Sequence, residues 1–107
     1  IDPVAGLYVY VANAGIGAVS GYALDPATCA LTTMDTDAVT GGTQATIAAG
    51  VTPLSVSIDP SSQYVYVANF TDNTVSTYSI GASGALTPVG TATATGAGPG
   101  SVTTVGQ

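Results

Sequence analysis

The chain contains no lysine, arginine, histidine, glutamate or tryptophan, and its only charged side chains are six aspartates. This absence argues against nucleic-acid binding, because no side chain can neutralise phosphate groups or release their counterions. Attraction to anionic membrane surfaces is disfavoured for the same reason. No apolar run is long enough for a membrane-spanning helix, and no basic segment marks a retained signal peptide. We therefore expect neither nucleic-acid partners nor membrane insertion.

Charge and cysteine are both scarce. Charged residues make up 6% of the chain, far below the roughly 25% that is typical of soluble domains. A surface of Ser, Thr, Asn and Gly is common in secreted, cell-surface and fibrous proteins, so the composition predicts an extracellular or cell-surface location. The single cysteine, Cys29, cannot form a disulfide within the chain, which leaves a free thiol or a link between two chains.

What the chain does contain is an internal repeat. The hexapeptide Tyr-Val-Tyr-Val-Ala-Asn occurs at Tyr8–Asn13 and again at Tyr64–Asn69. Further matches are Ile1–Pro3 with Ile58–Pro60, Val19–Leu24 with Val75–Ile80, Ala30–Thr32 with Ala85–Thr87, and Cys29 with Gly84. The repeat accounts for nearly the whole chain except an insertion at about 35–47, and it identifies a repeat architecture.

Each repeat holds four short apolar runs separated by turn residues, and none is long or periodic enough for a helix. In Leu54–Ile58 the apolar residues alternate with serines, so one face meets a core. Tyr64–Val67 carries tyrosines on one face and valines on the other, so both faces need cover. Pro88 fits an edge strand better than a central one. The order predicts an antiparallel meander of four strands, running from an inner strand to an outer edge.

Small twisted sheets with apolar faces pack face to face, and the compact solution is radial stacking around an axis. We therefore predict an all-β fold of β-propeller blades, about two per chain. Residues 1–49 form a first blade that lacks most of its inner strand, 50–97 a second blade, and 98–107 the inner strand of a following blade. Because propellers close with about four to eight blades, we expect either self-association or further blades of a longer parent chain.

The order of Asp-Pro, Tyr-Val-Tyr-Val-Ala-Asn, Asn73–Tyr78 and Gly84–Pro88 resembles the YVTN-repeat β-propellers. That family includes lactonase-like proteins related to 6-phosphogluconolactonase and repeat-rich surface proteins of archaea and bacteria. Both copies here carry alanine in place of the threonine of the YVTN motif. Lactonase-like members place His, Arg and Glu in the central cleft, and this chain has none of the three, so no catalytic residue can be carried over.

General acid–base catalysis near neutral pH usually draws on histidine, lysine, cysteine, tyrosine or a tuned carboxylate, and acyl transfer needs donors that stabilise negative charge. Asp2 and Asp59 stand at equivalent Asp-Pro turns, so turn formation explains them better than a role as a base. We therefore predict that the chain is not an enzyme, with no catalytic and no cofactor-binding residues.

Asp35 and Asp37 lie in the insertion, among other oxygen-bearing side chains of the kind that Ca²⁺ accepts. The spacing and the closing glutamate of an EF-hand are missing, and a solvated polar loop is the alternative. Asn69 also begins an Asn-Phe-Thr sequence that fits the N-glycosylation acceptor pattern. We take Asp35 and Asp37 as the candidate metal ligands.

Together these features predict a non-catalytic extracellular or cell-surface β-propeller module that acts as a structural, assembly or binding element. The alternative is a fragment of a lactonase-like propeller enzyme whose catalytic residues lie outside this chain.

Overall fold

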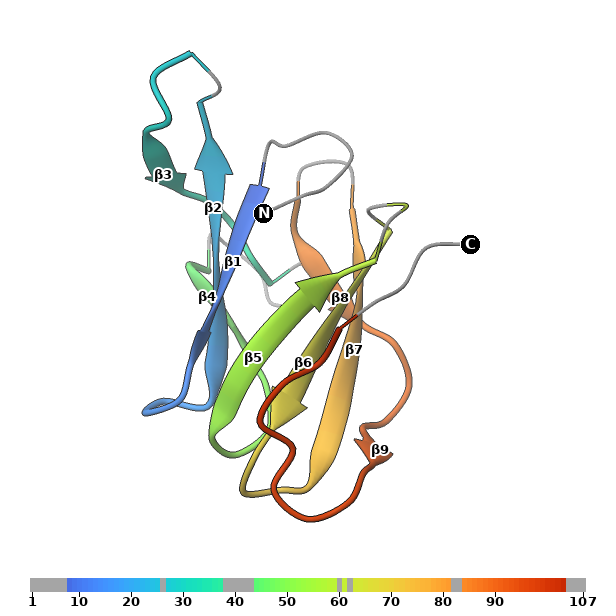
Figure 1. Ribbon diagram of the computed structural model, residues 1–107. Helices are drawn as coiled ribbons and strands as arrows, with labels where there is room; N and C mark the ends of the chain where they lie inside the picture. The colour runs from blue at the N-terminus through green and yellow to red at the C-terminus, as the bar shows by residue number, and fades with distance from the viewer. Residues whose placement is uncertain are drawn as a thin grey trace.

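The computed structural model of the chain describes residues 8–25, 27–37, 44–59, 61, 63–81 and 84–103 (Figure 1). These residues form nine β-strands in two antiparallel sheets and contain no helix. Accordingly, none of the described residues belongs to a helix that is long and apolar enough to cross a membrane. The prediction of an all-β fold is confirmed.

In the first sheet, β1 (Tyr8–Asn13) pairs with β2 (Ala18–Leu24). The other edge of β2 pairs with two short strands, β3 (Leu31–Thr33) at one end and β4 (Thr46–Ala48) at the other. The outer strand of this sheet is therefore split. The predicted insertion at about 35–47 begins after β3, and its last residues belong to β4.

The second sheet repeats this plan and adds an inner strand. Its strands are β5 (Pro53–Ile58), β6 (Tyr64–Asn69), β7 (Thr74–Ile80), β8 (Leu86–Pro88) and β9 (Thr93–Ala94). They pair in the order β5-β6-β7-β8, and β9 pairs with the remaining part of β7. This is the antiparallel meander that the apolar runs predicted.

Cys29 occupies a turn position that is shared by the two repeats. Cys29 has φ of 61° and its repeat counterpart Gly84 has φ of 88°, so both adopt the left-handed conformation. Glycine reaches this conformation without cost, whereas a residue with a Cβ is strained there. Cys29 therefore occupies an exposed turn site that the second repeat fills with glycine.

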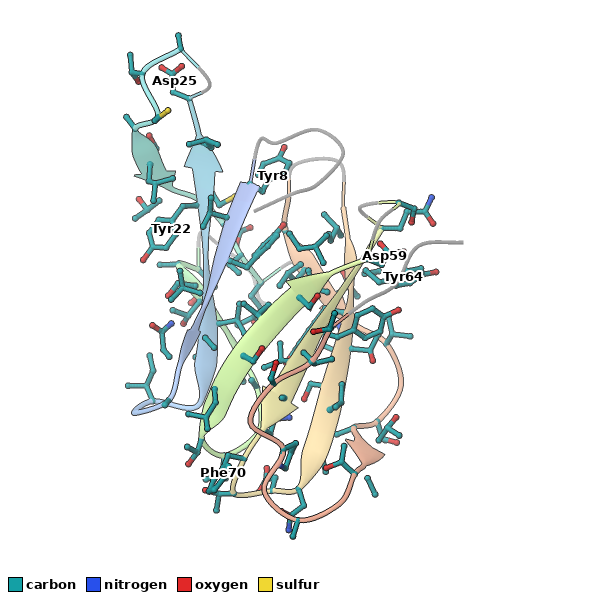
Figure 2. The ribbon with its side chains drawn as sticks, viewed as in Figure 1. Tyr8, Tyr22, Asp25, Asp59, Tyr64 and Phe70 are labelled. Atoms are coloured by element: carbon teal, nitrogen blue, oxygen red, sulfur yellow. The ribbon has the colours of Figure 1, made fainter. Side chains whose placement is uncertain are left out.

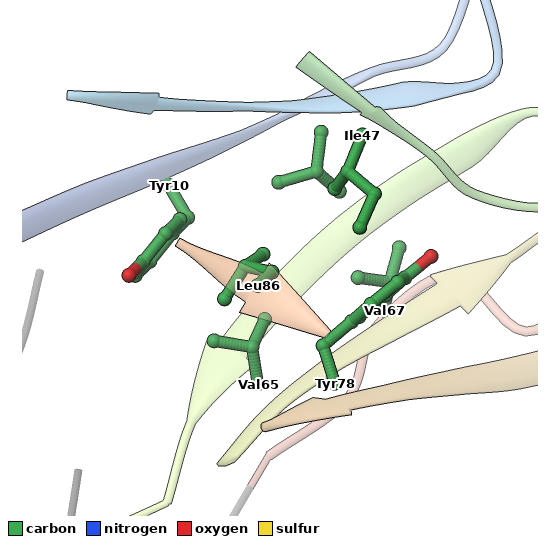
Figure 3. Packing of buried hydrophobic residues seen from close by; sticks show 7 residues of the cluster. Tyr10, Ile47, Val65, Val67, Tyr78 and Leu86 are labelled. Carbon is green, nitrogen blue, oxygen red and sulfur yellow. The ribbon is translucent and has the colours of Figure 1, made fainter. Parts of the chain in front are cut away.

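The core lies between the sheets, which pack face to face (Figure 3). Its buried members are Tyr10, Val19 and Ile47 from the first sheet and Val65, Val67, Tyr78 and Leu86 from the second. Two tyrosine hydroxyls extend across the interface to backbone carbonyl groups on the other side, one in the β7–β8 connection and one in β4. The Tyr10 hydroxyl donates to Gly84 O at 2.6 Å, and the Tyr78 hydroxyl donates to Ala48 O at 2.6 Å.

The start of the insertion is part of this interface. Thr36 is fully buried, and its hydroxyl accepts a hydrogen bond from Gly21 N at 3.0 Å and donates to Ala45 O at 3.0 Å. Leu86 N donates to Thr36 O at 2.7 Å, which joins the insertion to β8. Its first residues therefore connect the two sheets, while 38–43 lie outside the described residues.

The predicted blade boundaries at 49/50 and 97/98 remain predictions. Within 98–103 the chain forms no strand, and it lies against β5, where Val102 N donates to the Ser55 hydroxyl oxygen at 3.3 Å. The rest of the predicted third inner strand, 104–107, falls outside the described residues.

The turn between β5 and β6 is organised by Asp59. Its carboxylate accepts hydrogen bonds from the Ser61 hydroxyl at 2.7 Å and from the amides of Gln63 and Tyr64 at 2.9 and 3.1 Å. Slight burial raises the pKa of Asp59, but these hydrogen bonds together outweigh it and hold the pKa below its ordinary value of 3.8.

Leu86→Ala is expected to lower the free energy of unfolding by about 2–5 kcal/mol, because it leaves a cavity between the sheets. Leu31, its repeat counterpart, is 51% exposed, so Leu31→Ala is the matched control and is expected to change that free energy by less than about 0.5 kcal/mol. Urea unfolding of dilute protein measures both. Equal losses in the two variants would contradict the packing described here.

Asp59 is expected to make folding sensitive to acid. Because its pKa is lower in the folded chain, its stabilising contribution is present above the unfolded pKa and is lost as the pH falls through the folded pKa. The melting temperature of the wild type should therefore fall more steeply below about pH 4 than that of Asp59→Asn, which cannot ionise. Parallel pH profiles for the two proteins would refute this assignment.

Candidate functional site

Three connections meet at one end of the two sheets, the lower end in Figure 1. They are the β1–β2 turn at 14–17, the β4–β5 loop at 49–52 and the β6–β7 turn at 70–73. A groove of about 480 Å³ lies among them and is lined by all three, with Asp72 as its charged residue. A second groove of about 280 Å³ runs from Asp72 along β7 towards Gly90. This loop end is the candidate site.

Hydrogen bonds between the second and third connections define the shape of the loop end. The Asp72 carboxylate accepts from Val51 N at 2.8 Å, and the hydroxyls of Thr71 and Thr52 are hydrogen-bonded to each other at 2.8 Å. Phe70 N donates to Thr52 O at 2.8 Å. Thr52 has φ of 55°, which is unfavourable for a β-branched residue, so the surrounding contacts hold a strained backbone at the mouth of the groove.

Asn69, the last residue of the second hexapeptide, anchors the β4–β5 loop from inside the molecule. It is fully buried, and its side-chain oxygen accepts from Gly50 N at 3.0 Å. Its side-chain amide donates to the hydroxyls of Thr74 and Ser76 at 3.1 and 2.8 Å. A side chain at Gly50 would collide with Asn69, since an added Cβ would lie 2.6 Å from its Cγ.

Asn13 is the repeat counterpart of Asn69 and shows which part of this arrangement is common. Its amide donates to the Ser20 hydroxyl at 2.6 Å, as Asn69 does to Ser76, but Asn13 remains partly exposed. This structural role of the asparagines was not predicted from the sequence, although the asparagine that ends both hexapeptides was the available signal. Burial of Asn69, with its amide in two hydrogen bonds, also excludes its glycosylation in the folded chain.

The predicted metal ligands lie away from this end, at the base of the insertion. The Asp35 carboxylate accepts a hydrogen bond from Gln44 N at 3.0 Å, and Asp37 forms a parallel bridge to Leu86. Burial raises the pKa of Tyr78, and the charge of Asp37 acts in the same direction, whereas a hydrogen bond with Ser76 lowers it. Across the described part of the chain, no three or more His, Cys, Asp or Glu side chains gather as a metal site. Calcium binding remains a prediction.

The chemistry at the loop end is limited to hydrogen bonding. Thr52 offers a hydroxyl, Asp72 offers carboxylate oxygens, and the loops contribute backbone groups. Because the chain has no lysine, arginine or histidine, it cannot place a positive side chain beside a developing oxyanion. The groove can therefore orient a polar ligand, but it lacks a complete acid–base pair.

The model of a family described as the seven-bladed β-propeller lactonases matches residues 5–105. The chain belongs to this lactonase family. The prediction that the protein is not an enzyme is therefore contradicted, because the family that the chain matches is a family of enzymes. The error came from treating the absence of His, Arg, Lys and Glu among these residues as evidence about activity.

Two solved structures share the fold. One is a protein from Bacteroides fragilis assigned as a 6-phosphogluconolactonase, with a TM-score of 0.75 and 22% identity over 90% of this chain and 24% of that one. The other is hydrazine synthase from Kuenenia stuttgartiensis, with a TM-score of 0.63 and 19% identity over 92% of this chain and 23% of that one. The chain thus spans about a quarter of each. A search of curated sequences found no relative of significant similarity.

Asn69→Ala is expected to lower the free energy of unfolding by about 2–3 kcal/mol, since it leaves the Gly50 amide and two hydroxyls without their buried partner. Asn13→Ala is the matched control and should cost about 1 kcal/mol or less, because Asn13 is partly exposed to water. Chemical denaturation measures the difference, and hydrogen exchange at Gly50 reports on the loop itself. Equal costs, or an unchanged exchange rate at Gly50, would show that Asn69 does not anchor the loop.

Proposed function

We propose that this chain supplies two neighbouring blades of a lactonase propeller whose catalytic residues lie outside these 107 residues. The match of the lactonase family model over residues 5–105 carries this proposal. The two packed antiparallel sheets support it, because each has the plan of a propeller blade. The sequence left two functions open, a surface module and a fragment of a lactonase-like enzyme. The proposal is the second of these.

The substrate class is a lactone, a cyclic ester. Water adds to the carbonyl carbon, the ring C–O bond breaks, and the released alkoxide takes a proton, so the product is an open hydroxy acid. This reaction needs a base for the water and a donor for the oxyanion. Those groups would come from other blades. This chain would contribute its loop end, which would form part of the rim of the propeller.

At the loop end, the side chains of this chain would hold the β4–β5 loop in place. Asn69 and Asp72 hold the β4–β5 loop through the amides of Gly50 and Val51. The loop in turn presents the Thr52 hydroxyl at the groove. We also infer that the repeats are of the YVTN class, on the two Tyr-Val-Ala-Asn motifs and the turn positions shared by the two copies. A cell-surface location remains a prediction from composition.

The test is lactone hydrolysis by the polypeptide that contains this chain together with the blades that close the ring. Ring opening releases a proton at neutral pH, so a pH indicator follows the reaction. A phosphorylated sugar δ-lactone is the first substrate to test, because a structural neighbour is assigned as a 6-phosphogluconolactonase. We expect hydrolysis well above the spontaneous rate, and none above it from the 107 residues alone.

Two results would contradict the proposal. Hydrolysis by the 107 residues alone would place the catalytic groups inside this chain. A closed propeller that hydrolyses none of a panel of γ- and δ-lactones would exclude lactone hydrolysis as the activity. Asn69→Ala in the active polypeptide then tests the role of the rim, with Asn13→Ala as its control.

A further inference from the structure

The larger groove at the loop end has both of its walls in this chain. One wall is the β1–β2 turn of the first sheet and the other is the β6–β7 turn of the second, with the β4–β5 loop beside them. Further blades of a propeller stack on the outer faces of these two sheets. Stacking there leaves both walls of this groove in place, so its lining can be read from this chain.

The walls combine exposed apolar side chains with a few polar groups. Ile16 is 70% exposed and Val51 is 52% exposed, although both are large aliphatic residues. They line the groove together with Thr52 and Asp72. Sites for small molecules commonly have this composition, in which polar groups at a few points fix the orientation of the ligand. The apolar walls suit the C–H faces of a small organic ligand.

The two polar side chains provide one acceptor and one donor. Asp72 Oδ2 accepts a hydrogen bond from Val51 N at 2.8 Å, and within the described part of the chain no group donates to Oδ1. The Thr71 hydroxyl donates to the Thr52 hydroxyl oxygen at 2.8 Å, so the Thr52 proton can be donated to a ligand oxygen. An accepting carboxylate and a donating hydroxyl match the hydroxyl groups of a polyol.

Charge restricts the ligand further. Asp72 is the charged residue of the groove, and the chain contains no lysine, arginine or histidine. A phosphate group bound here would place about two negative charges beside a carboxylate, with no cation from either wall. Neutral hydroxyl groups meet no such repulsion.

We propose that this groove binds the hydroxyl-bearing end of the lactone, and that Asp72 makes the propeller selective for unphosphorylated sugar lactones over phosphorylated ones. Its substrate class rests on the proposed lactone hydrolysis. Asp72 accepts from the ligand hydroxyls, Thr52 donates to one of them, and Ile16 and Val51 cover the C–H face of the ring. A phosphorylated lactone is then hydrolysed less efficiently than its unphosphorylated counterpart.

The test compares one sugar δ-lactone with and without a terminal phosphate, on the polypeptide that contains this chain and the blades that close the ring. We expect kcat/KM to be about five- to tenfold higher for the unphosphorylated lactone at low ionic strength, which corresponds to repulsion between the two groups across about 6 Å of water. Added salt should reduce this ratio, because it screens exposed charges.

Asp72→Asn removes the charge but keeps a side-chain oxygen that can accept from Val51 N. The ratio should therefore fall to near one and lose its dependence on salt. Asp25→Asn is the matched control, because Asp25 is also an exposed aspartate in a turn and accepts from Ala27 N at 2.9 Å. Figure 2 shows Asp25 at the end of the molecule opposite Phe70, which belongs to the same turn as Asp72. The control should leave the ratio unchanged.

Binding of the matching δ-lactams separates this selectivity from the hydrolysis itself. A lactam has nitrogen in place of the ring oxygen, so the groove can bind it whether or not the propeller hydrolyses lactones. Calorimetry should show the unphosphorylated lactam binding about five- to tenfold more tightly than the phosphorylated one. Asp72→Asn should remove that difference, and Asp25→Asn should not.

Three results would overturn the proposed selectivity while lactone hydrolysis stands. They are a wild type that prefers the phosphorylated lactone, a ratio that Asp72→Asn leaves unchanged, and an equal shift in Asp25→Asn. Selective lactam binding without hydrolysis of any lactone would instead refute the proposed function and leave the role of Asp72 in place. Neither binding nor hydrolysis would overturn both.

Discussion

The packing of Tyr10, Val19 and Ile47 of the first sheet against Val65, Val67, Tyr78 and Leu86 of the second is the interaction on which the rest of the structure depends. A single small sheet has nothing packed across its faces, so neither sheet could bury its apolar side chains alone. The contact also aligns the hydroxyls of Tyr10 and Tyr78 with the backbone carbonyl groups of Gly84 and Ala48 across the interface. Hydrophobic burial and directional bonds thus select the same arrangement.

That arrangement brings the loop end together. Once the sheets are packed, the β4–β5 loop runs from one sheet to the other. Asn69 holds this loop by accepting a hydrogen bond from Gly50 N. Asn69 and Asn13 have the same sequence context, yet only Asn69 is fully buried. Burial of an amide without partners is costly, so Asn69 is satisfied at every polar atom, whereas Asn13 retains access to water.

Function is where the sequence misled. The absence of His, Arg, Lys and Glu is a true property of these residues, and it correctly shows that the loop end has no complete acid–base pair. The prediction drawn from that absence was overturned by the family match, because the matching family is one of enzymes. Function depends on sites built on a fold, so the side chains of two blades do not determine the chemistry of a whole propeller.

The sequence by itself determined the repeat, the strands and the meander, because turn residues and period-two alternation are local properties of the chain. It even placed Cys29 at the turn where the other repeat has glycine, a position where φ is positive in both. Only the tertiary structure decided that Thr36 lies between the sheets, that Asn69 anchors a loop and that Asp72 lines the groove. Those roles arise from contacts between residues distant in the chain, which no local pattern encodes.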